Sequence, residues 1–334
     1  MKHLMGFGVM FFTLSSCVTL DALLPFHGNI PCGEVDETTC DKEDIWDAVC
    51  LTCEQEYDWT KEYDWREKTL DTLEGIRPVD TEVVAAGWTT EDGTYDLDAY
   101  LIPAHGDEPE LADTTIIFNH GRYASIEHYA PRVRFFHELG YTVFVWDYRG
   151  YGKSLPTDDS VEPSAPATAD WMSDALAAFD RAKELAPNPD RLVIYGMSVG
   201  GMPAGEMAYK REACAQVYEA AYNSISAKVE TNLALSMPGS FLTTGLVENE
   251  LKLADTTIPA LVIHGDLDDR ILIDEVERLY EALPEDLPKE FVTIAGGGHG
   301  MGGIGGVPEQ GVGAYGDHLE GFFSTHAPDC IGSD

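Results

Sequence analysis

Short apolar runs alternate with longer helical patterns through most of this chain, and this alternation constrains the fold more than any other feature. The apolar runs lie at 115–118, 142–146, 192–195, 217–221, 260–263 and 291–294. Apolar residues recur at helical spacing in the segments 126–139, 169–185, 199–211, 271–283 and 314–325. Short buried strands separated by helices of this length predict a mostly parallel sheet that helices cover on both faces.

Two further strands are expected before the first of these runs. Residues 81–89 and 95–102 flank Glu91-Asp92-Gly93, a turn sequence typical of β-hairpins. We expect one α/β domain over residues 81–334. Residues 17–80 are acidic and rich in cysteine, and we expect them to form a tether and a small N-terminal extension packed on this domain.

The first residues have the composition of an export signal. The apolar run from Leu4 to Leu14 is shorter than the ~20 residues that a bilayer span needs, but it fits a signal peptide. It ends in Leu14-Ser15-Ser16-Cys17, which resembles the lipobox of bacterial lipoproteins, where the cysteine is acylated. We therefore expect a signal peptide at 1–16 and a lipid anchor on Cys17 in the bacterial cell envelope, with an ordinary secretory signal as the alternative. Val18, rather than an aspartate, favours the outer membrane or the periplasmic face.

The other cysteines are even in number, as expected for disulfides in an exported chain. They are Cys32, Cys40, Cys50, Cys53, Cys214 and Cys330. Three pairings stay open among the first four, and the last two are the natural remaining pair, which would tie the C-terminus to the domain. The Cys50-Leu51-Thr52-Cys53 segment lacks the flanking strand and helix of a redox motif and the additional ligands of a zinc site.

The net charge of −38 results from 21 Lys plus Arg and 59 Asp plus Glu. Such a chain does not bind nucleic acid through a basic face, and charge does not draw it to anionic lipid. With 44% hydrophobic residues its composition is globular rather than disordered. We interpret the acidity as a solvated surface, with attraction of a cationic partner as the alternative.

The segment Gly196-Met197-Ser198-Val199-Gly200 directly follows an apolar run and precedes a helical pattern. This strand–turn–helix context is what a nucleophile elbow requires. The turn is so sharp that its serine is strained, and small residues two before and two after the serine let strand and helix approach closely. The hydroxyl then stands at the positive end of the helix. We predict that Ser198 is a nucleophile, against the alternative of a structural Gly-Ser turn.

A serine hydroxyl is a weak nucleophile and needs a base, which in turn needs an acid to orient it. In this fold class the acid follows a late strand and precedes the histidine in the chain. Three aspartates follow the run 260–263, and the spacing H-G-x-x-D selects Asp268. For Asp266 and Asp269 the alternative is turn formation and capping of the next helix.

The base is expected after the last strand. His299 follows the run 291–294 and has glycines on both sides, which give its loop the freedom to reach the serine. His318 and His326 fall in the last helical pattern, where a surface or packing role is expected.

An oxyanion hole needs backbone N–H donors near the nucleophile. One is expected from Val199, the residue after the serine. The other should follow Asn119-His120-Gly121 at the end of the run 115–118, so Arg122 is the predicted donor and Tyr123 the alternative. We expect His120 to brace this loop rather than to transfer protons.

Three blocks, completed by Asp268 and His299, carry a family resemblance: Asn119-His120-Gly121, Trp146-Asp147-Tyr148-Arg149-Gly150-Tyr151-Gly152-Lys153-Ser154, and 196–201. On these residues the chain resembles the α/β-hydrolase superfamily, in its compact branch of serine esterases and aminopeptidases, over about residues 81–326. The resemblance implies a mostly parallel eight-stranded sheet with a short cap, and no metal or organic cofactor. It also implies a structural turn in the second block, fixed by Asp147 and Arg149.

These features predict hydrolysis of a small-molecule ester or other acyl substrate by an esterase, thioesterase or lipase-like enzyme. A serine peptidase of the prolyl or aminoacyl type is the second expectation, because the sequence has no separate propeller or large cap. A lipid-anchored binding protein with an idle triad is the third. The segment 226–255 is expected to form a small apolar lid, or else one ordinary helix and a loop.

Overall fold

The computed structural model describes residues 81–104, 109–122, 125–163, 166–224, 248–299 and 312–332. The predicted signal peptide, Cys17, and the extension with Cys32, Cys40, Cys50 and Cys53 lie outside the described residues, as does most of the expected lid. None of the helices in the described part of the chain is long and apolar enough to cross a membrane.

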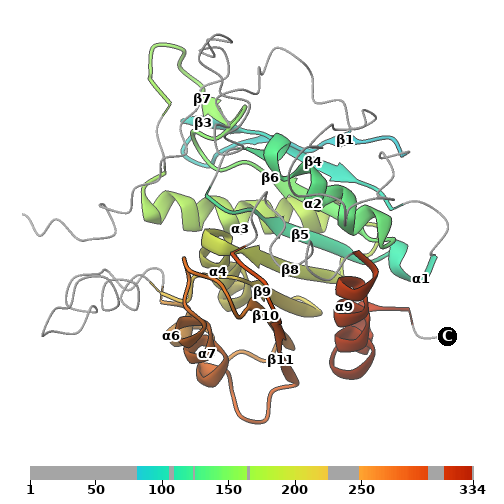
Figure 1. The fold of residues 1–334 in the computed structure, drawn as a ribbon. Helices are drawn as coiled ribbons and strands as arrows, with labels where there is room; N and C mark the ends of the chain where they lie inside the picture. Colours follow the sequence, from blue (N-terminus) through green and yellow to red (C-terminus); the bar gives the residue numbers. More distant parts are fainter. Residues whose placement is uncertain are drawn as a thin grey trace, which may run out of the picture.

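The core of the fold is an eight-stranded sheet, as predicted (Figure 1). Its order is β1-β4-β6-β5-β8-β9-β10-β11, and all neighbours from β6 to β11 run parallel, while β1 and β4 are antiparallel to the strands beside them. The strands are β1 (Val84–Ala85), β4 (Ala99–Ile102), β5 (Thr115–Asn119), β6 (Thr142–Trp146), β8 (Leu192–Met197), β9 (Ala215–Glu219), β10 (Ala260–Gly265) and β11 (Lys289–Ile294).

The predicted hairpin forms, but each of its two strands is divided between two sheets. β2 (Trp88–Thr89) pairs with β3 (Tyr95–Leu97), and β3 also pairs with β7 (Leu155–Pro156), in a separate three-stranded sheet. The break falls at Gly87, where a Cβ would lie 2.6 Å from the carbonyl oxygen of Leu97. The close approach at this glycine lets the chain pass from one sheet to the other.

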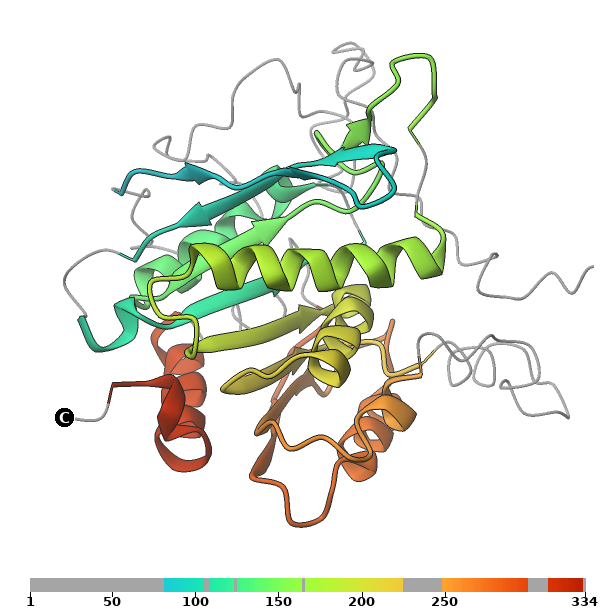
Figure 2. The same ribbon diagram turned by 180° about the vertical axis from the view of Figure 1, so that it is seen from behind.

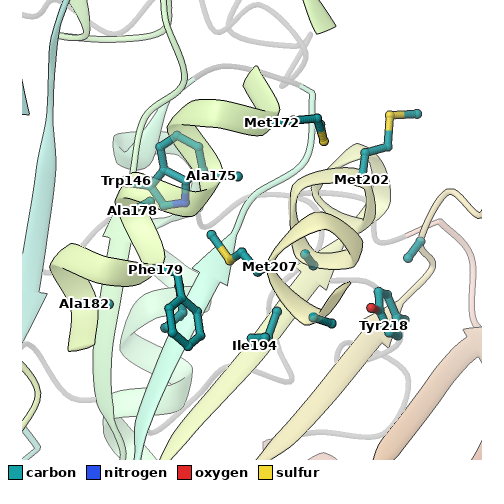
Figure 3. Packing of buried hydrophobic residues seen from close by; sticks show 14 of the residues in the cluster. Trp146, Met172, Ala175, Ala178, Phe179, Ala182, Ile194, Met202, Met207 and Tyr218 are labelled. Atoms are coloured by element: carbon teal, nitrogen blue, oxygen red, sulfur yellow. The ribbon is translucent and has the colours of Figure 1, made fainter. Parts of the chain in front are cut away.

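Helices cover both faces of the large sheet. They are the short α1 (Pro109–Ala112), α2 (Ile126–Glu138), α3 (Thr168–Leu185), α4 (Gly201–Lys210), the short α6 (Asn249–Lys252), α7 (Ile273–Ala282) and α9 (Val312–His326). Side chains of α3, α4 and α7 form one buried apolar cluster with the sheet, and side chains of α2 and α9 form the other. Figure 2 shows α3 and α4 lying across one face, and Figure 3 shows their residues packing around Trp146 and Ile194.

The segment after α9 is attached to the end of the sheet at which the parallel strands begin. The sulfur atoms of Cys214 and Cys330, the predicted pair, lie 2.11 Å apart, as in a disulfide. Cys214 directly precedes β9, and Cys330 ends a short 3₁₀ turn, Pro328–Cys330, after α9. The hydroxyl of Thr114, just before β5, donates to the carbonyl oxygen of Cys330.

Candidate active site

The turn that carries Ser198 has the backbone of a nucleophile elbow. β8 ends at Met197, a 3₁₀ turn covers Ser198–Gly200, and α4 begins at Gly201. Ser198 has a φ of 53°, in the left-handed region that costs an L-residue about 1–2 kcal/mol. The predicted strain at this serine is therefore present in the structure.

Glycines on both sides of the turn allow close contact between strand, helix and the neighbouring loop. A Cβ on Gly196 would lie 2.7 Å from the Cβ of Ala204 in α4. A Cβ on Gly200 would lie only 2.0 Å from the carbonyl oxygen of Asn119. Neither position accepts a larger residue unless α4 or the loop after β5 moves.

The structure brings Ser198, His299 and Asp268 into one hydrogen-bonded chain. Oγ of Ser198 lies 2.9 Å from Nε2 of His299, and Nδ1 of His299 lies 2.8 Å from Oδ2 of Asp268. An ionised carboxylate only accepts hydrogen bonds, so Nδ1 carries the proton and Nε2 is the acceptor for the serine hydroxyl. The His299 side chain keeps 12% of its surface exposed, whereas that of Asp268 is fully buried.

The Asp268 carboxylate is held as an anion by its donors. Its Oδ1 accepts from the backbone N–H groups of Arg270 and Ile271, each at 2.9 Å, while Oδ2 accepts from His299. Burial acts to raise the pKa of this carboxyl, but the hydrogen bond and charge of His299 and the two amides outweigh burial and lower the pKa. Asp268 therefore stays ionised at neutral pH and can stabilise a positive imidazole.

Asp266 and Asp269, the two alternatives to Asp268, lie in the same loop after β10 but outside the triad. Asp266 accepts at 2.7 Å from the backbone N–H of Gly296, which joins the acid loop to the histidine loop. A Cβ on Gly265 would lie 2.2 Å from the carbonyl oxygen of Gly297, so the backbones of the two loops are also in direct contact. Asp269 is exposed.

His264, which the sequence analysis did not place in the site, lies beside the acid. Its Nε2 donates to the carbonyl oxygen of Ile271 at 3.0 Å and lies 3.8 Å from Oδ2 of Asp268. Burial lowers the pKa of this imidazole, so His264 is neutral at pH 7 and does not compete with His299 for the carboxylate charge. The histidine of the H-G-x-x-D motif thus closes the turn that carries the acid.

The loop after β5 reaches the nucleophile. A Cβ on Gly121 would lie 3.4 Å from the Cβ of Ser198 and 2.5 Å from the hydroxyl oxygen of Tyr129 in α2. The predicted donor Arg122 is the next residue and is half-buried. Val199 lies in the first turn after β8, where backbone N–H groups have no acceptor within the helix. Tyr129 was missed by the sequence analysis, and the alternative donor Tyr123 lies outside the described residues.

The loop after β6 supports the loop after β5. Oδ1 of Asp147 accepts from the backbone N–H of Ile126 at 2.9 Å, where α2 begins, and lies 3.2 Å from Nε2 of His120. Arg149 binds Asp174 of α3 at 2.6 Å. The Asp147 carboxylate also lies against its own turn, where a Cβ on Gly152 would be 2.3 Å from Oδ2. The partners of Arg149, in contrast, are on neighbouring elements rather than in the turn.

A second buried polar cluster joins four elements on the α2 and α9 side of the sheet. Glu219, at the end of β9, accepts from Arg132 of α2 at 2.5 Å. It also accepts from the hydroxyls of Tyr195 in β8 and Tyr315 in α9, the second at 2.6 Å. Sequence analysis missed this cluster because each charged residue alone resembles a surface position.

The last helix contains two further histidines, as expected from the sequence. His318 and His326 are on α9, and the ring of His326 packs 5.5 Å from that of Phe322. Among the described residues, no group of His, Cys, Asp or Glu is arranged to hold a metal ion.

Comparison with known proteins places this arrangement in a family. The chain is 30% identical to the uncharacterized protein YfhR of Salmonella typhimurium over 233 residues, 66% of this chain and 76% of that relative. YfhR of Escherichia coli K12 is 31% identical over 234 residues, 69% of this chain and 77% of that relative. A sequence model of the family described as serine aminopeptidase, S33, matches residues 111–256. The chain belongs to the α/β-hydrolase superfamily.

Solved structures of other α/β hydrolases share the fold. The Pyrococcus furiosus esterase Pf2001 superimposes with a TM-score of 0.55 at 23% identity, over 72% of this chain and 93% of that one. A puromycin-hydrolyzing peptidase of Mycobacterium tuberculosis gives a TM-score of 0.52 at 20% identity, over 72% of this chain and 39% of that one. Esterases and peptidases thus both occur on the fold of this α/β hydrolase.

Proposed function

We propose that the chain hydrolyses carboxylic esters or thioesters of small molecules through an acyl-enzyme on Ser198. The observation that supports this proposal is the unbroken series of hydrogen bonds from Oγ of Ser198 through His299 to Asp268, with lengths of 2.9 and 2.8 Å. His299 takes the hydroxyl proton as Oγ attacks the acyl carbonyl, and it returns that proton to the departing alcohol or thiol. Water, deprotonated by His299, then attacks the acyl-enzyme, releases the acid and restores the serine.

In this mechanism the negative oxygen of each tetrahedral intermediate needs fixed donors. The backbone N–H groups of Val199 and Arg122 are our candidates, because both belong to segments that contact Ser198. Removal of one such donor typically lowers kcat by about 10²–10³-fold. No step of the mechanism calls for a metal or an organic cofactor.

A serine peptidase acting on aminoacyl amides is the second candidate. Two observations favour it: the family match is described as serine aminopeptidase, S33, and one structural neighbour is a puromycin-hydrolyzing peptidase. The triad serves either substrate, since both reactions transfer an acyl group to water. We place the ester first, because the segment 226–255, where a cap is expected, is short for enclosing a peptide.

The test uses a fluorophosphonate probe on the purified protein beside Ser198→Ala. We expect the wild type to be labelled and the variant to be inert, so labelling that persists in Ser198→Ala would refute the nucleophile. A folded wild type that takes no label would instead favour a binding protein with an idle triad. Rates on p-nitrophenyl esters against aminoacyl p-nitroanilides then separate esterase from peptidase.

We also propose that residues 1–16 are removed on export and that Cys17 anchors the protein in the cell envelope through lipid. The support is the Leu14-Ser15-Ser16-Cys17 sequence after an apolar run, together with the Cys214–Cys330 pairing, which suits an oxidising compartment. Cys17→Ser should release the protein from the membrane fraction. Unchanged membrane retention would count against the anchor.

A further inference from the structure

A second strained residue lies close to the nucleophile elbow. In the described part of the chain, Ser198 and Ala220 are the two residues other than glycine with a left-handed φ, at 53° and 42°. Residues with a Cβ rarely adopt this conformation, and they keep it only where the surrounding structure imposes it. Ala220 directly follows β9 and is buried, so contacts on both of its sides hold it in this conformation.

The residue before Ala220 is fixed in the core. The side chain of Glu219 accepts from Arg132 of α2 at 2.5 Å and from the hydroxyl of Tyr315 in α9 at 2.6 Å. Its backbone is paired with Ile263 of β10, and the N–H of Ala220 donates to the carbonyl oxygen of Ile263 at 2.9 Å. The end of β9 therefore cannot shift along its neighbour to relax the φ of Ala220.

The residues after Ala220 are fixed against the start of α4. Nδ2 of Asn249 in α6 donates to the carbonyl oxygens of Gly201 at 2.8 Å and of Tyr222 at 3.3 Å. A Cβ on Gly201 would lie 2.7 Å from the Cβ of Ala221, so the segment after β9 packs directly on the first residue of the helix. The strained turn thus connects a fixed strand to a fixed helix start.

This turn brings the Tyr222 N–H to the nucleophile. The N–H donates to the carbonyl oxygen of Ser198 at 2.9 Å, so one hydrogen bond joins the two strained turns. The Gly201 N–H also donates to this oxygen within the 3₁₀ turn, and the Tyr222 N–H adds a donor from outside that turn.

The Ser198 carbonyl shares one peptide unit with the N–H of Val199, our candidate oxyanion donor. The described residues include no cis peptide, and in a planar trans unit the carbonyl and the N–H point in opposite directions. A donor that holds the Ser198 carbonyl therefore also sets the direction of the Val199 N–H, which points away from Tyr222.

We propose that Ala220 is a positioning residue, whose left-handed turn presents the Tyr222 N–H to the Ser198 carbonyl and thereby fixes the Val199 N–H for the oxyanion. Such a donor acts on charge that develops in the transition state, so its loss lowers kcat rather than raising KM. The effect on catalysis rests on the proposed acyl-transfer function, whereas the hydrogen bond between the two turns does not.

The variants Ala220→Gly and Ala220→Val test the turn, because glycine adopts a left-handed φ readily and a β-branched residue does not. On the best ester, we expect Ala220→Val to lower kcat by roughly 10²-fold with KM changed no more than about threefold. Ala220→Gly should keep kcat within about threefold of the wild type.

Ala215→Val is the matched control for overpacking. Ala215 is fully buried at the start of β9, so valine adds the same methyl groups to the same strand at the end remote from the elbow. We expect this variant to keep kcat within about threefold of the wild type, whatever its stability.

The hydrogen bond is tested by amide hydrogen exchange of the full chain, measured by NMR in the wild type and both Ala220 variants. We expect the Tyr222 amide to exchange slowly in the wild type and in Ala220→Gly, and rapidly in Ala220→Val. The amide of Ala260, which donates to the carbonyl oxygen of Pro288 at the start of β10, should stay protected in all three.

Two kinetic results would overturn the positioning role. Equal losses of kcat in Ala220→Val and Ala220→Gly would assign the effect to the methyl group rather than to the turn. Equal losses in Ala220→Val and Ala215→Val would assign it to overpacking. If Ala220→Val does not fold, replacement of Tyr222 by its α-hydroxy acid removes only the N–H, and an unchanged kcat there would also overturn the proposal.

Rapid exchange of the Tyr222 amide in the folded wild type would refute the hydrogen bond itself. A failure of the proposed function is separately visible, because probe labelling of Ser198→Ala would refute the nucleophile and leave the exchange of the Tyr222 amide unchanged.

Discussion

Ser198→Gly should give a more stable protein than Ser198→Ala, although both variants lose the nucleophile. Neither variant has the hydroxyl, so the comparison isolates the Cβ atom. At a φ of 53° the Cβ is in steric strain with the neighbouring backbone, and glycine has no Cβ and therefore no such strain. The elbow is therefore expected to be a place where the native residue reduces stability in exchange for an accessible hydroxyl.

The magnitude follows from two opposing terms. Relief of left-handed strain stabilises the folded glycine variant by about 1–2 kcal/mol. The greater freedom of glycine in the unfolded chain opposes this by about 0.5–1 kcal/mol. We expect a net gain of about 0.5–1 kcal/mol for Ser198→Gly over Ser198→Ala.

A matched control exists in α3. Ala177 is half-buried within this helix, and Ala177→Gly should reduce the free energy of unfolding by about 1 kcal/mol. The two alanine-to-glycine changes therefore differ in sign, which urea denaturation with equal m-values can resolve. If glycine at 198 were as destabilising as glycine at 177, the argument for stored strain in the elbow would be wrong.

Four further predictions concern the acid, the contact between Gly200 and the end of β5, and the cysteine pair. Asp268→Asn should lower kcat by about 10⁴-fold at pH 7, measured on the best ester, because the amide favours the wrong imidazole tautomer. Folding lowers the pKa of Asp268, so the ionised carboxylate contributes to stability above pH 3.8, and this contribution is lost as the pH falls through the lowered pKa. Asp268→Asn should therefore reduce the acid sensitivity of the melting temperature. Gly200→Ala should abolish probe labelling, since its Cβ would lie 2.0 Å from a backbone oxygen. Replacing Cys214 and Cys330 by Ala should cost about 4–5 kcal/mol in urea unfolding, given their separation of 116 residues; a loss under about 1 kcal/mol would contradict a native cross-link.

The sheet could be predicted because buried parallel strands are continuous apolar runs. The run 142–146 coincides with β6 residue for residue. β9 begins two residues before its predicted start because Gln216 is buried there and donates to the carbonyl oxygen of Ile258 at 2.8 Å. A polar residue satisfied by a distant backbone group leaves no local signal, so the pattern began the strand too late.

In the candidate site too, residues with a local sequence signal could be predicted, and residues whose role depends on packing could not. Ser198 lies between glycines that its turn requires, and the loop before His299 contains Gly296, whose φ of 78° favours glycine, so a short stretch of sequence identifies both residues. Tyr129 is marked by nothing local, because its contact with Gly121 depends on how α2 packs against the loop after β5. His264 belongs to the H-G-x-x-D motif, but its role is visible only in its contact with the carbonyl oxygen of Ile271. The sequence therefore identifies the reacting groups more readily than it identifies the groups that hold them in place.

The two ends of the sheet have opposite mechanical roles. At the carboxyl ends of the parallel strands, the end of β5 approaches the turn after β8 at Gly200, and the loops after β10 and β11 approach each other at Gly265, at distances that only glycine permits. Such contacts bury little side-chain surface and include a strained residue, so this end contributes function rather than stability. At the other end, Cys214 and Cys330 join the start of β9 to the segment after α9, and the Thr114 hydroxyl binds the same segment. The cross-link predicted there would restrain α9, the helix that follows the histidine loop, so its loss should loosen His299 as well as lower stability. Reduction of the Cys214–Cys330 bond should therefore lower kcat at temperatures well below global unfolding, and unchanged kcat in the reduced protein would show that the two ends are independent.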